Sequence, residues 1–309
     1  MAARIGVIRA GERSAREIAA HSRAALDRPL AHAAELWVAV AYDEALLVGA
    51  FQRGAGLPAT WPLLRRGSGG PEVLVGSGTV HVALALEHPG ALEPCDEKRI
   101  VNRSVRPLLR ALTRCGHLAH YFGRDWVSVG HRPAAWVGFA HDSTTRRTLL
   151  EAFVAVRTPF ATAQRATMLG KPQGTLESIG GRAVDPGRIA QAVVDAYVAR
   201  YDAEAVDLPV PEVSPDSSDP RVDPPWTATC EEAIGTLGAG ADARGALRLG
   251  GDLLVSRDAL ARLEARLAGA PDADIGGLVD ETLAAPGVAL EGVRSLASVR
   301  DVLLRARRG

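Results

Sequence analysis

One stretch of the chain holds the residues whose types and spacing best suit chemistry. It reads Leu64-Arg65-Arg66-Gly67-Ser68-Gly69-Gly70-Pro71-Glu72-Val73. Glycines lack a Cβ, so the backbone can come close to a ligand and offer unobstructed N–H groups. An arginine beside them adds a fixed fork of donors, which suits a carboxylate or a phosphate. The alternative is a surface hairpin turn with solvated arginines, because Gly-rich turns are common.

This order of residues, arginine-arginine-x-serine-glycine-glycine, resembles the signature of the lipoate–protein ligases in the biotin/lipoate ligase superfamily. Other landmarks of that family follow in the same order: Trp37, Leu46-Leu47-Val48-Gly49-Ala50-Phe51-Gln52, Gly78-Thr79, Asn102-Arg103-Ser104-Val105 and Gly123-Arg124-Asp125. The similarity extends from about Leu36 to Tyr201 and resumes near Gly245.

The resemblance implies that the glycine loop wraps an acyl-adenylate made from ATP, with Mg²⁺ present. The residues implied to bind substrate or nucleotide are Arg65, Arg66, Ser68, Gly69, Gly70, Gly78, Asn102, Arg124 and Asp125. The acid is lipoic acid or a related fatty acid, and the acceptor amine is a lysine of a lipoyl-type carrier domain. For Asn102 the residues alone leave a capping role open, and for Arg124 with Asp125 a turn with a local ion pair.

The chain departs from the family at two places. Pro71-Glu72-Val73 replaces a Gly-Ala-Val run that leads to an aromatic residue, a histidine and an aspartate. Aligned without gaps, the family's bridging lysine falls on Pro133. A cation is needed there because the acid carboxylate and the ATP phosphates repel each other. Arg132, one residue earlier, is the predicted catalytic cation, and a solvated loop arginine is the alternative.

Three functions therefore stay open. The first is an ATP-dependent acyl–protein ligase. The second is a catalytically impaired homologue that binds a small acid or regulates, which the lost lysine favours. The third is an amide-forming ligase with a changed acid or amine. Turnover distinguishes them, through pyrophosphate release from ATP in the presence of the acid.

Composition narrows the classes of partner. The chain has 309 residues, 47% of them hydrophobic and 23% charged, with 36 basic against 36 acidic residues. Without a basic excess, neither a nucleic acid nor an anionic membrane is expected as partner. No run near the start suits a signal peptide and none later suits a membrane span. Three irregularly spaced cysteines suggest reduced thiols and a cytoplasmic location.

Other constellations are weaker. Cys115, His117 and His120, with or without Cys95, match no familiar zinc spacing, so no metal site is predicted. An acyl-cysteine mechanism lacks a suitably placed thiol, because Cys230 follows the linker. Aromatic residues that could line an acyl tunnel serve equally well as core: Phe51, Trp136 and Phe139. P-loop, dinucleotide and His-Glu-x-x-His motifs are absent from the sequence.

Periodicity predicts an α/β (α+β) protein, and the resemblance makes it a mixed-sheet biotin/lipoate ligase-like catalytic domain with a small C-terminal α/β accessory domain. The expected division is 1–207 for the catalytic domain, 208–226 for a Pro-, Asp- and Ser-rich linker and 227–309 for the accessory domain. Expected helices are 14–26, 97–114, 187–201, one from Ser256, 275–283 and 296–304. The first is predicted to begin with a capping box formed by Ser14 and Glu17. The second has one apolar face, and Pro107 predicts a kink or a helix start nearer Ser104; the face consists of Ile100, Val101, Val105, Leu108, Leu109 and Leu112. Expected strands are 35–41 and 45–51 as a hairpin, 73–75, 79–86, 126–129, 134–140, 148–156 and a pair within 245–255. Gly76-Ser77-Gly78 predicts a bend or bulge between 73–75 and 79–86.

Overall fold

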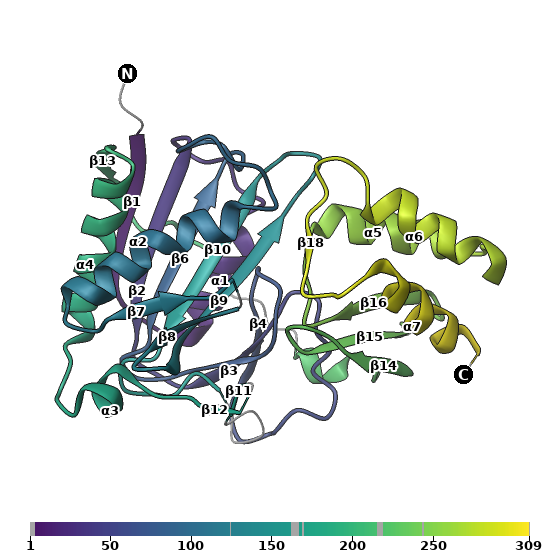
Figure 1. Cartoon of the computed structure of the whole chain (residues 1–309), viewed down its shortest axis with the longest axis horizontal. Helices are drawn as coiled ribbons and strands as arrows, with labels where there is room; N and C mark the ends of the chain where they lie inside the picture. The colour runs from purple at the N-terminus through teal and green to yellow at the C-terminus, as the bar shows by residue number, and fades with distance from the viewer. Residues whose placement is uncertain are drawn as a thin grey trace.

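The computed structural model describes residues 4–123, 125–161, 167–168, 170–214, 219–242 and 244–308. It shows two units side by side, a larger N-terminal one built on a broad sheet and a smaller C-terminal one (Figure 1). Among the residues described, no helix combines the length and apolar character that a membrane span needs.

An eight-stranded mixed sheet in the order β13-β1-β2-β6-β10-β9-β8-β7 organises the N-terminal unit. Strand β1 pairs in parallel with both β2 and β13, and all other neighbours are antiparallel. The strands are β1 (Arg4–Arg13), β2 (Ala34–Ala41), β6 (Val80–Leu86), β7 (Ala119–Tyr121), β8 (Trp126–Val129), β9 (Arg132–His141), β10 (Thr148–Val154) and β13 (Glu204–Asp207). Every residue of β6 and β10 is buried, because both faces of the sheet are covered.

Two helices cover one face of this sheet. They are α2 (Ile100–Arg114) and α4 (Pro186–Arg200), with the short α3 (Leu176–Gly180) nearby. The apolar face predicted for α2 is buried as expected, apart from the half-buried Leu109. Pro107 lies inside α2, yet the helix begins at Ile100 rather than near Ser104. The phenol of Tyr197 on α4 donates to the carbonyl of Ser104 at 2.8 Å and ties the two helices together.

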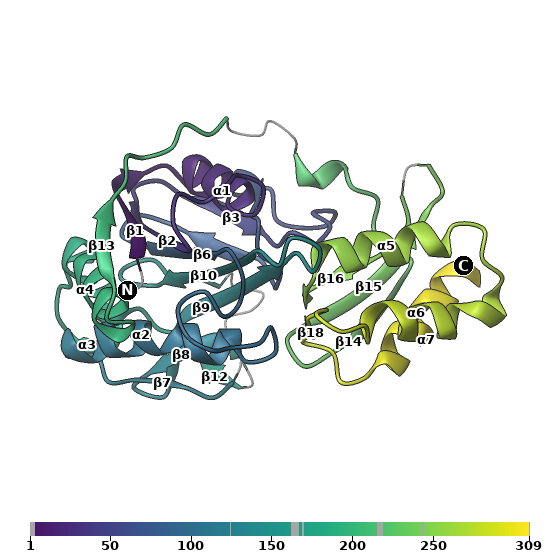
Figure 2. The same ribbon diagram turned by 90° about the horizontal axis from the view of Figure 1, so that it is seen from above.

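The other face carries α1 (Ala15–Ala24) and a three-stranded sheet (Figure 2). That small sheet has the order β4-β3-β5, from β4 (Leu63–Arg65), β3 (Ala45–Val48) and β5 (Val73–Val75). Helix α1 begins with the predicted capping box, in which Ser14 and Glu17 exchange hydrogen bonds. A two-stranded hairpin, β11 (Thr167–Met168) with β12 (Lys171–Pro172), completes the unit.

The predicted hairpin of residues 35–41 and 45–51 is wrong. Strand β2 lies between β1 and β6 in the main sheet, whereas β3 pairs with β4 and β5 in the small one. The turn between them changes layers instead of reversing within one sheet. The bend predicted at Gly76-Ser77-Gly78 is present, and there the chain returns from β5 to β6 through Gly78 at a φ of +83°.

The C-terminal unit has its own apolar cluster, from Ala228 to Leu303. Its sheet has the order β14-β15-β16, and a separate pair joins β17 to β18. The elements are β14 (Ala228–Glu231), β15 (Thr236–Ala241), β16 (Leu247–Gly251), β17 (Leu254–Val255), α5 (Arg257–Leu267), α6 (Ile275–Leu283), β18 (Leu290–Glu291) and α7 (Leu296–Arg308). The expected pairing within 245–255 is wrong, because β16 pairs with β15 and β17 with β18. Before this unit, a 3₁₀ turn (Pro220–Val222) interrupts the predicted linker. Within the unit, a second 3₁₀ turn (Asp272–Asp274) precedes α6.

Candidate functional site

The glycine loop follows β4 and lies where the main sheet, the small sheet and the C-terminal unit meet. Arg66 at its start is fully buried. Its guanidinium donates to the carbonyl oxygens of Leu47 at 2.7 Å, Gly69 at 2.9 Å and Pro71 at 2.6 Å. The Nε–H donates to the Ser68 hydroxyl at 3.1 Å. The alternative of a solvated turn is therefore wrong for Arg66, which holds the loop in shape from inside.

Arg66 also lies over an aromatic ring, with its Cζ 4.1 Å from the ring centroid of Trp136. Burial lowers the pKa of Arg66 to about 10, although the nearby carboxylates of Glu151, Glu72 and Asp252 act in the opposite direction. At neutral pH the guanidinium remains charged, since its pKa stays well above 7.

A buried acid and a buried histidine face the loop from the main sheet. His81 on β6 and Glu151 on β10 are both fully buried, with 2.7 Å between His81 Nε2 and Glu151 Oε1. The other carboxylate oxygen accepts the Ser68 N–H at 3.3 Å. Burial alone would raise the pKa of Glu151, but the hydrogen bond and charge of His81, together with Ser68 and Arg66, bring it below its ordinary value. The loop is thus anchored to the sheet through a carboxylate.

The N–H groups of the two glycines have partners within the protein. Gly69 donates to the carbonyl of Phe139 at 2.9 Å, and Gly70 donates to the carbonyl of Leu253 at 2.9 Å. Leu253 belongs to the C-terminal unit, so that unit closes over the loop. A Cβ on Gly69 would lie 2.0 Å from the Leu253 oxygen, and one on Gly70 would lie 2.4 Å from Trp136. Glycine is required here because of close approach by the protein itself.

A second polar contact between the units lies beside the loop. The Gln52 amide donates to Glu72 Oε2 at 3.1 Å and to Asp252 Oδ1 at 2.6 Å, and all three residues are buried. Asp252 Oδ2 accepts the N–H of Thr236 at 2.8 Å. Glu72, which stands where the resemblance placed a small residue, is thereby linked through Gln52 to the C-terminal unit.

Arg65 has a different environment from Arg66. Its guanidinium donates to the carbonyl of Gln52 at 2.6 Å and pairs with Asp223 at 2.6 Å. It lines a cavity of about 420 Å³ between the two units, together with Arg53, Trp226 and further residues. Of the predicted binding residues, Arg65 therefore has its guanidinium at a cavity that a ligand could enter.

The remaining predicted residues lie in several places. Gly78 is in the turn before β6, and its N–H donates to the carbonyl of Ala41 at 2.9 Å. Asn102 is exposed in the first turn of α2. Arg124 lies outside the described residues. Asp125 is buried before β8, and its backbone carbonyl accepts the N–H of Val137 at 2.7 Å.

Arg132 begins β9 and contacts a neighbouring segment. Its Nη2 donates to the carbonyl of Gln173 at 2.6 Å and its Nε to that of Pro172 at 3.4 Å. Its role as the catalytic cation remains a prediction. Trp136 and Phe139 project from opposite faces of β9 into different apolar clusters, so they do not line one tunnel. In the part of the chain that is described, no group of three or more His, Cys, Asp or Glu side chains could hold a metal ion.

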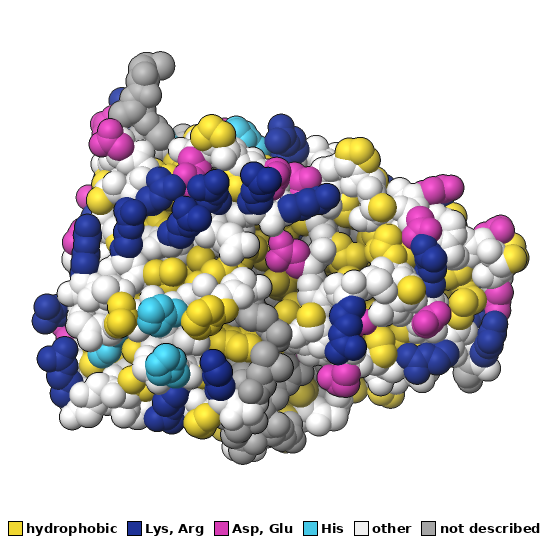
Figure 3. Space-filling model, viewed as in Figure 1, with side chains coloured by type: hydrophobic (Ala, Val, Ile, Leu, Met, Phe, Trp, Pro, Cys, Tyr) yellow, Lys and Arg dark blue, Asp and Glu magenta, His cyan; other side chains and the backbone are white. Residues whose placement is uncertain are grey.

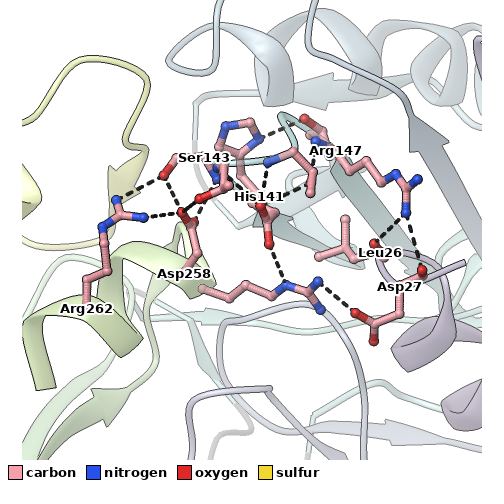
Figure 4. Close-up of polar contacts among 12 residues, drawn as sticks. Leu26, Asp27, His141, Ser143, Arg147, Asp258 and Arg262 are labelled. Atoms are coloured by element: carbon pink, nitrogen blue, oxygen red, sulfur yellow. Dashed lines mark hydrogen bonds and ion pairs between the residues drawn. The ribbon is translucent and has the colours of Figure 1, made fainter. Parts of the chain in front are cut away.

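A polar junction also holds the C-terminal unit, through the loop between β9 and β10 (Figure 4). Asp258, in the first turn of α5, accepts hydrogen bonds from the N–H and hydroxyl of Ser143 at 2.7 and 2.6 Å, from the Thr144 hydroxyl at 2.9 Å and from Arg262. Burial alone would raise the pKa of Asp258, but these hydrogen bonds lower it. Arg257 pairs with Asp142 at 3.2 Å and with Asp27 at 2.7 Å.

Several of these residues were not predicted from the sequence. Glu151 is the single acidic residue in a strand that is otherwise apolar apart from Thr148, and this isolation was a usable signal. Glu72 was noted only as a departure from the family pattern. Leu253 acts through its backbone carbonyl, so its residue type carried no signal.

A substitution at Gly69 tests the contact between loop and C-terminal unit. Gly69→Ala places a methyl group against the Leu253 carbonyl, so we expect the free energy of unfolding to fall by about 2 kcal/mol. Urea denaturation measures this, and amide hydrogen exchange at Gly70 should become faster. The matched control is Gly277→Ala in α6, where the new methyl group meets nothing within 4 Å. Equal stability of the wild type and Gly69→Ala would contradict the tight contact.

Solved structures show the same fold. LipL1 of P. falciparum, in complex with lipoate, is similar to this chain with a TM-score of 0.65 and 12% identity, over 97% of this chain and 99% of that one. A T. acidophilum protein with bound lipoic acid matches with a TM-score of 0.52 and 13% identity, over 69% of this chain and 91% of that one. The bi-partite lipoate protein ligase of T. acidophilum, described with its E2 lipoyl domain, gives 0.52 and 12%, over 68% and 88%.

No family model and no curated protein sequence matches the chain. The lipoate–protein ligase resemblance drawn from the residues is confirmed at the level of the fold, and the match to LipL1 extends over both units. The predicted α/β class with a mixed sheet is confirmed as well.

Proposed function

We propose that this protein is an ATP-dependent ligase that activates lipoic or a related fatty acid and transfers the acyl group to an amine. A lysine of a lipoyl-type carrier domain is the proposed acceptor. The observation that carries the proposal is the match, over both units, to a structure that holds lipoate. The glycine loop supports it, because its motif lies between the two units beside a cavity.

The reaction has two steps. A carboxylate oxygen of the acid attacks the α-phosphorus of ATP, a new P–O bond forms and pyrophosphate leaves. The amine nitrogen then attacks the acyl carbon, AMP leaves with the electrons of the C–O bond, and the amine loses a proton. Both steps develop charge on oxygen, so fixed cations and N–H donors provide the catalysis.

The residues have separate proposed roles. Arg65, at the edge of the cavity, would bind a phosphate or carboxylate in exchange for Asp223. Arg66 would shape the loop from within. For the Gly70 N–H to reach a ligand oxygen, the Leu253 carbonyl has to release it. Mg²⁺ usually keeps several of its waters and binds through phosphates and one or two carboxylates. If it takes part, the carboxylate of Asp125 would hold it beside the phosphates, and it would supply positive charge there.

A second candidate is a protein that binds the acid without activating it. The specific observation in its favour is that Arg132 donates to the backbone of residues 172–173 while Pro133 occupies the lysine position. Such a protein would retain lipoic acid but release no pyrophosphate.

Acyl-adenylate formation separates the two. Lipoic and octanoic acid are supplied with ATP, and the acyl-adenylate is quantified by mass spectrometry for the wild type, Arg132→Ala and Pro133→Lys. If Arg132 is the bridging cation, Arg132→Ala lowers the rate roughly a hundredfold. The control is Arg146→Ala, an exposed loop arginine.

Equal rates in the wild type and Arg132→Ala would remove Arg132 from the mechanism. If the wild type forms no acyl-adenylate and Pro133→Lys does, the fold is retained but the bridging cation is missing from the wild type. If neither the wild type nor Pro133→Lys forms the acyl-adenylate, but calorimetry detects binding of lipoic acid to the wild type, the protein binds the acid without activating it.

A further inference from the structure

A row of arginines runs along the exposed side of α2, on the face of the main sheet opposite the glycine loop. Its members, at spacings of four, three, four and four residues, are Arg99, Arg103, Arg106, Arg110 and Arg114. We call them the arginine row. These spacings place all five on one helical face, and the space-filling view shows basic side chains gathered along α2 (Figure 3).

The row carries a local electrostatic cost. Successive arginines three and four residues apart repel each other, and α2 has no acidic residue in its first turn to favour the helix dipole. Arg99 lies 3.9 Å from Asp96. For the four arginines that follow, the described part of the chain supplies no ion-pair partner. A chain of zero net charge thus keeps an uncompensated cationic stripe at one place.

We propose that the arginine row is a docking surface for an acidic protein. Each guanidinium offers a planar fork that matches a carboxylate. The row spans about 22 Å at 1.5 Å per residue, so it fits a partner helix that presents Glu or Asp at every fourth position. The acidic side chains of such a partner would reduce the repulsion between the arginines of α2. The surface should therefore bind acidic partners in preference to neutral or basic ones.

An apolar anchor adjoins the end of the row. Leu118 is 63% exposed and follows α2 closely in the chain. The N–H of its neighbour Ala119 donates to the Thr113 hydroxyl at 3.3 Å, which holds this segment against the helix end. Leu118 follows Arg114, the last arginine of the row, by four residues, and an exposed aliphatic side chain near a charged surface can serve as the apolar contact of a protein interface.

A nucleic acid fits this surface less well. The chain has 36 basic and 36 acidic residues, whereas nucleic-acid-binding domains usually carry a basic excess. Helix α2 contains no aromatic side chain on which a base could stack. The proposal does not depend on the ligase activity, because the row and the glycine loop lie on opposite faces of the sheet.

Charge reversal at Arg106 tests the proposal in two ways. The introduced carboxylate would form ion pairs with Arg103 and Arg110, so Arg106→Glu should raise the melting temperature by about 2 °C. The same change should weaken binding of the partner. The probe is a labelled 18-residue helical peptide with Glu at every fourth position and a leucine at one end, followed by fluorescence anisotropy at low salt.

We expect Arg106→Glu to weaken peptide binding about tenfold and a peptide with its central Glu replaced by Lys to restore it. Arg146→Glu is the matched control, since Arg146 is an exposed loop arginine outside the row, and it should bind like the wild type. Equal binding by both variants would overturn the proposal. So would tighter binding of an 18-base-pair DNA duplex than of the peptide, or a wild type that dimerises through the row.

Discussion

Replacing Arg66 by alanine is expected to lower the free energy of unfolding by about 4 kcal/mol. The fully buried guanidinium satisfies the carbonyl oxygens of Leu47, Gly69 and Pro71. Its removal leaves these acceptors without their donor and leaves Glu151 without a neighbouring cation in the interior. Breaking a buried charge interaction on one side costs about 3–5 kcal/mol, because the remaining charge stays desolvated.

Urea denaturation at pH 7 measures this loss, with Arg146→Ala as the exposed control, for which a change within about 0.5 kcal/mol is expected. Arg66→Lys sharpens the test. It keeps the charge but loses the fork, so it should be intermediate. Stability of Arg66→Ala close to that of the wild type would mean that the loop holds its shape without the guanidinium.

The second large effect is a loss of stability in mild acid that depends on His21. Its ring lies 3.8 Å from the ring of Trp37, in a stacked arrangement, and it is buried. Burial lowers the pKa of His21 to about 3, and His81 and Arg28 act in the same direction. Because the ordinary pKa is 6.5, the unfolded chain binds a proton between these values and the folded chain does not.

Stability therefore falls as the pH drops below about 6.5, by about 2 kcal/mol between pH 7 and pH 5 from this one group. His21→Phe keeps a planar ring against Trp37 and removes the titration, so its stability should change less over the same range. Urea midpoints at several pH values measure the difference in slope. The exposed His120→Phe is the control, and an identical pH dependence in the wild type and His21→Phe would contradict the lowered pKa.

Local patterns predicted the elements whose information lies within one segment. The capping box at Ser14, the apolar face of α2 and the bend at Gly78 were all read from neighbouring residues. The glycine loop was identified by its motif. Its position between closely packed layers is consistent with glycine at residues 69 and 70, where a Cβ would clash.

Contacts between distant segments could not be read in this way. Strand β2 takes its partners from β1 and β6, so the apolar runs before and after residues 42–44 looked like one hairpin. The Gly70–Leu253 hydrogen bond joins two backbone groups, which carry no sequence signal. For Arg66 the sequence left two possibilities, a ligand contact and a solvated turn, and both leave the side chain accessible. Only the surrounding layers bury it.

The parallel pairing of β1 has a consequence for how the chain folds as it is made. Strand β1 is the first strand, yet its outer neighbour is β13, roughly two hundred residues later. Until residues 204–207 are synthesised, one edge of β1 exposes unpaired N–H and C=O groups. The main sheet therefore gains its edge strand β13 late. This pairing brings together segments that are far apart in the chain, which slows folding. A nascent chain cut short before Glu204 keeps this edge open and becomes a template for aggregation.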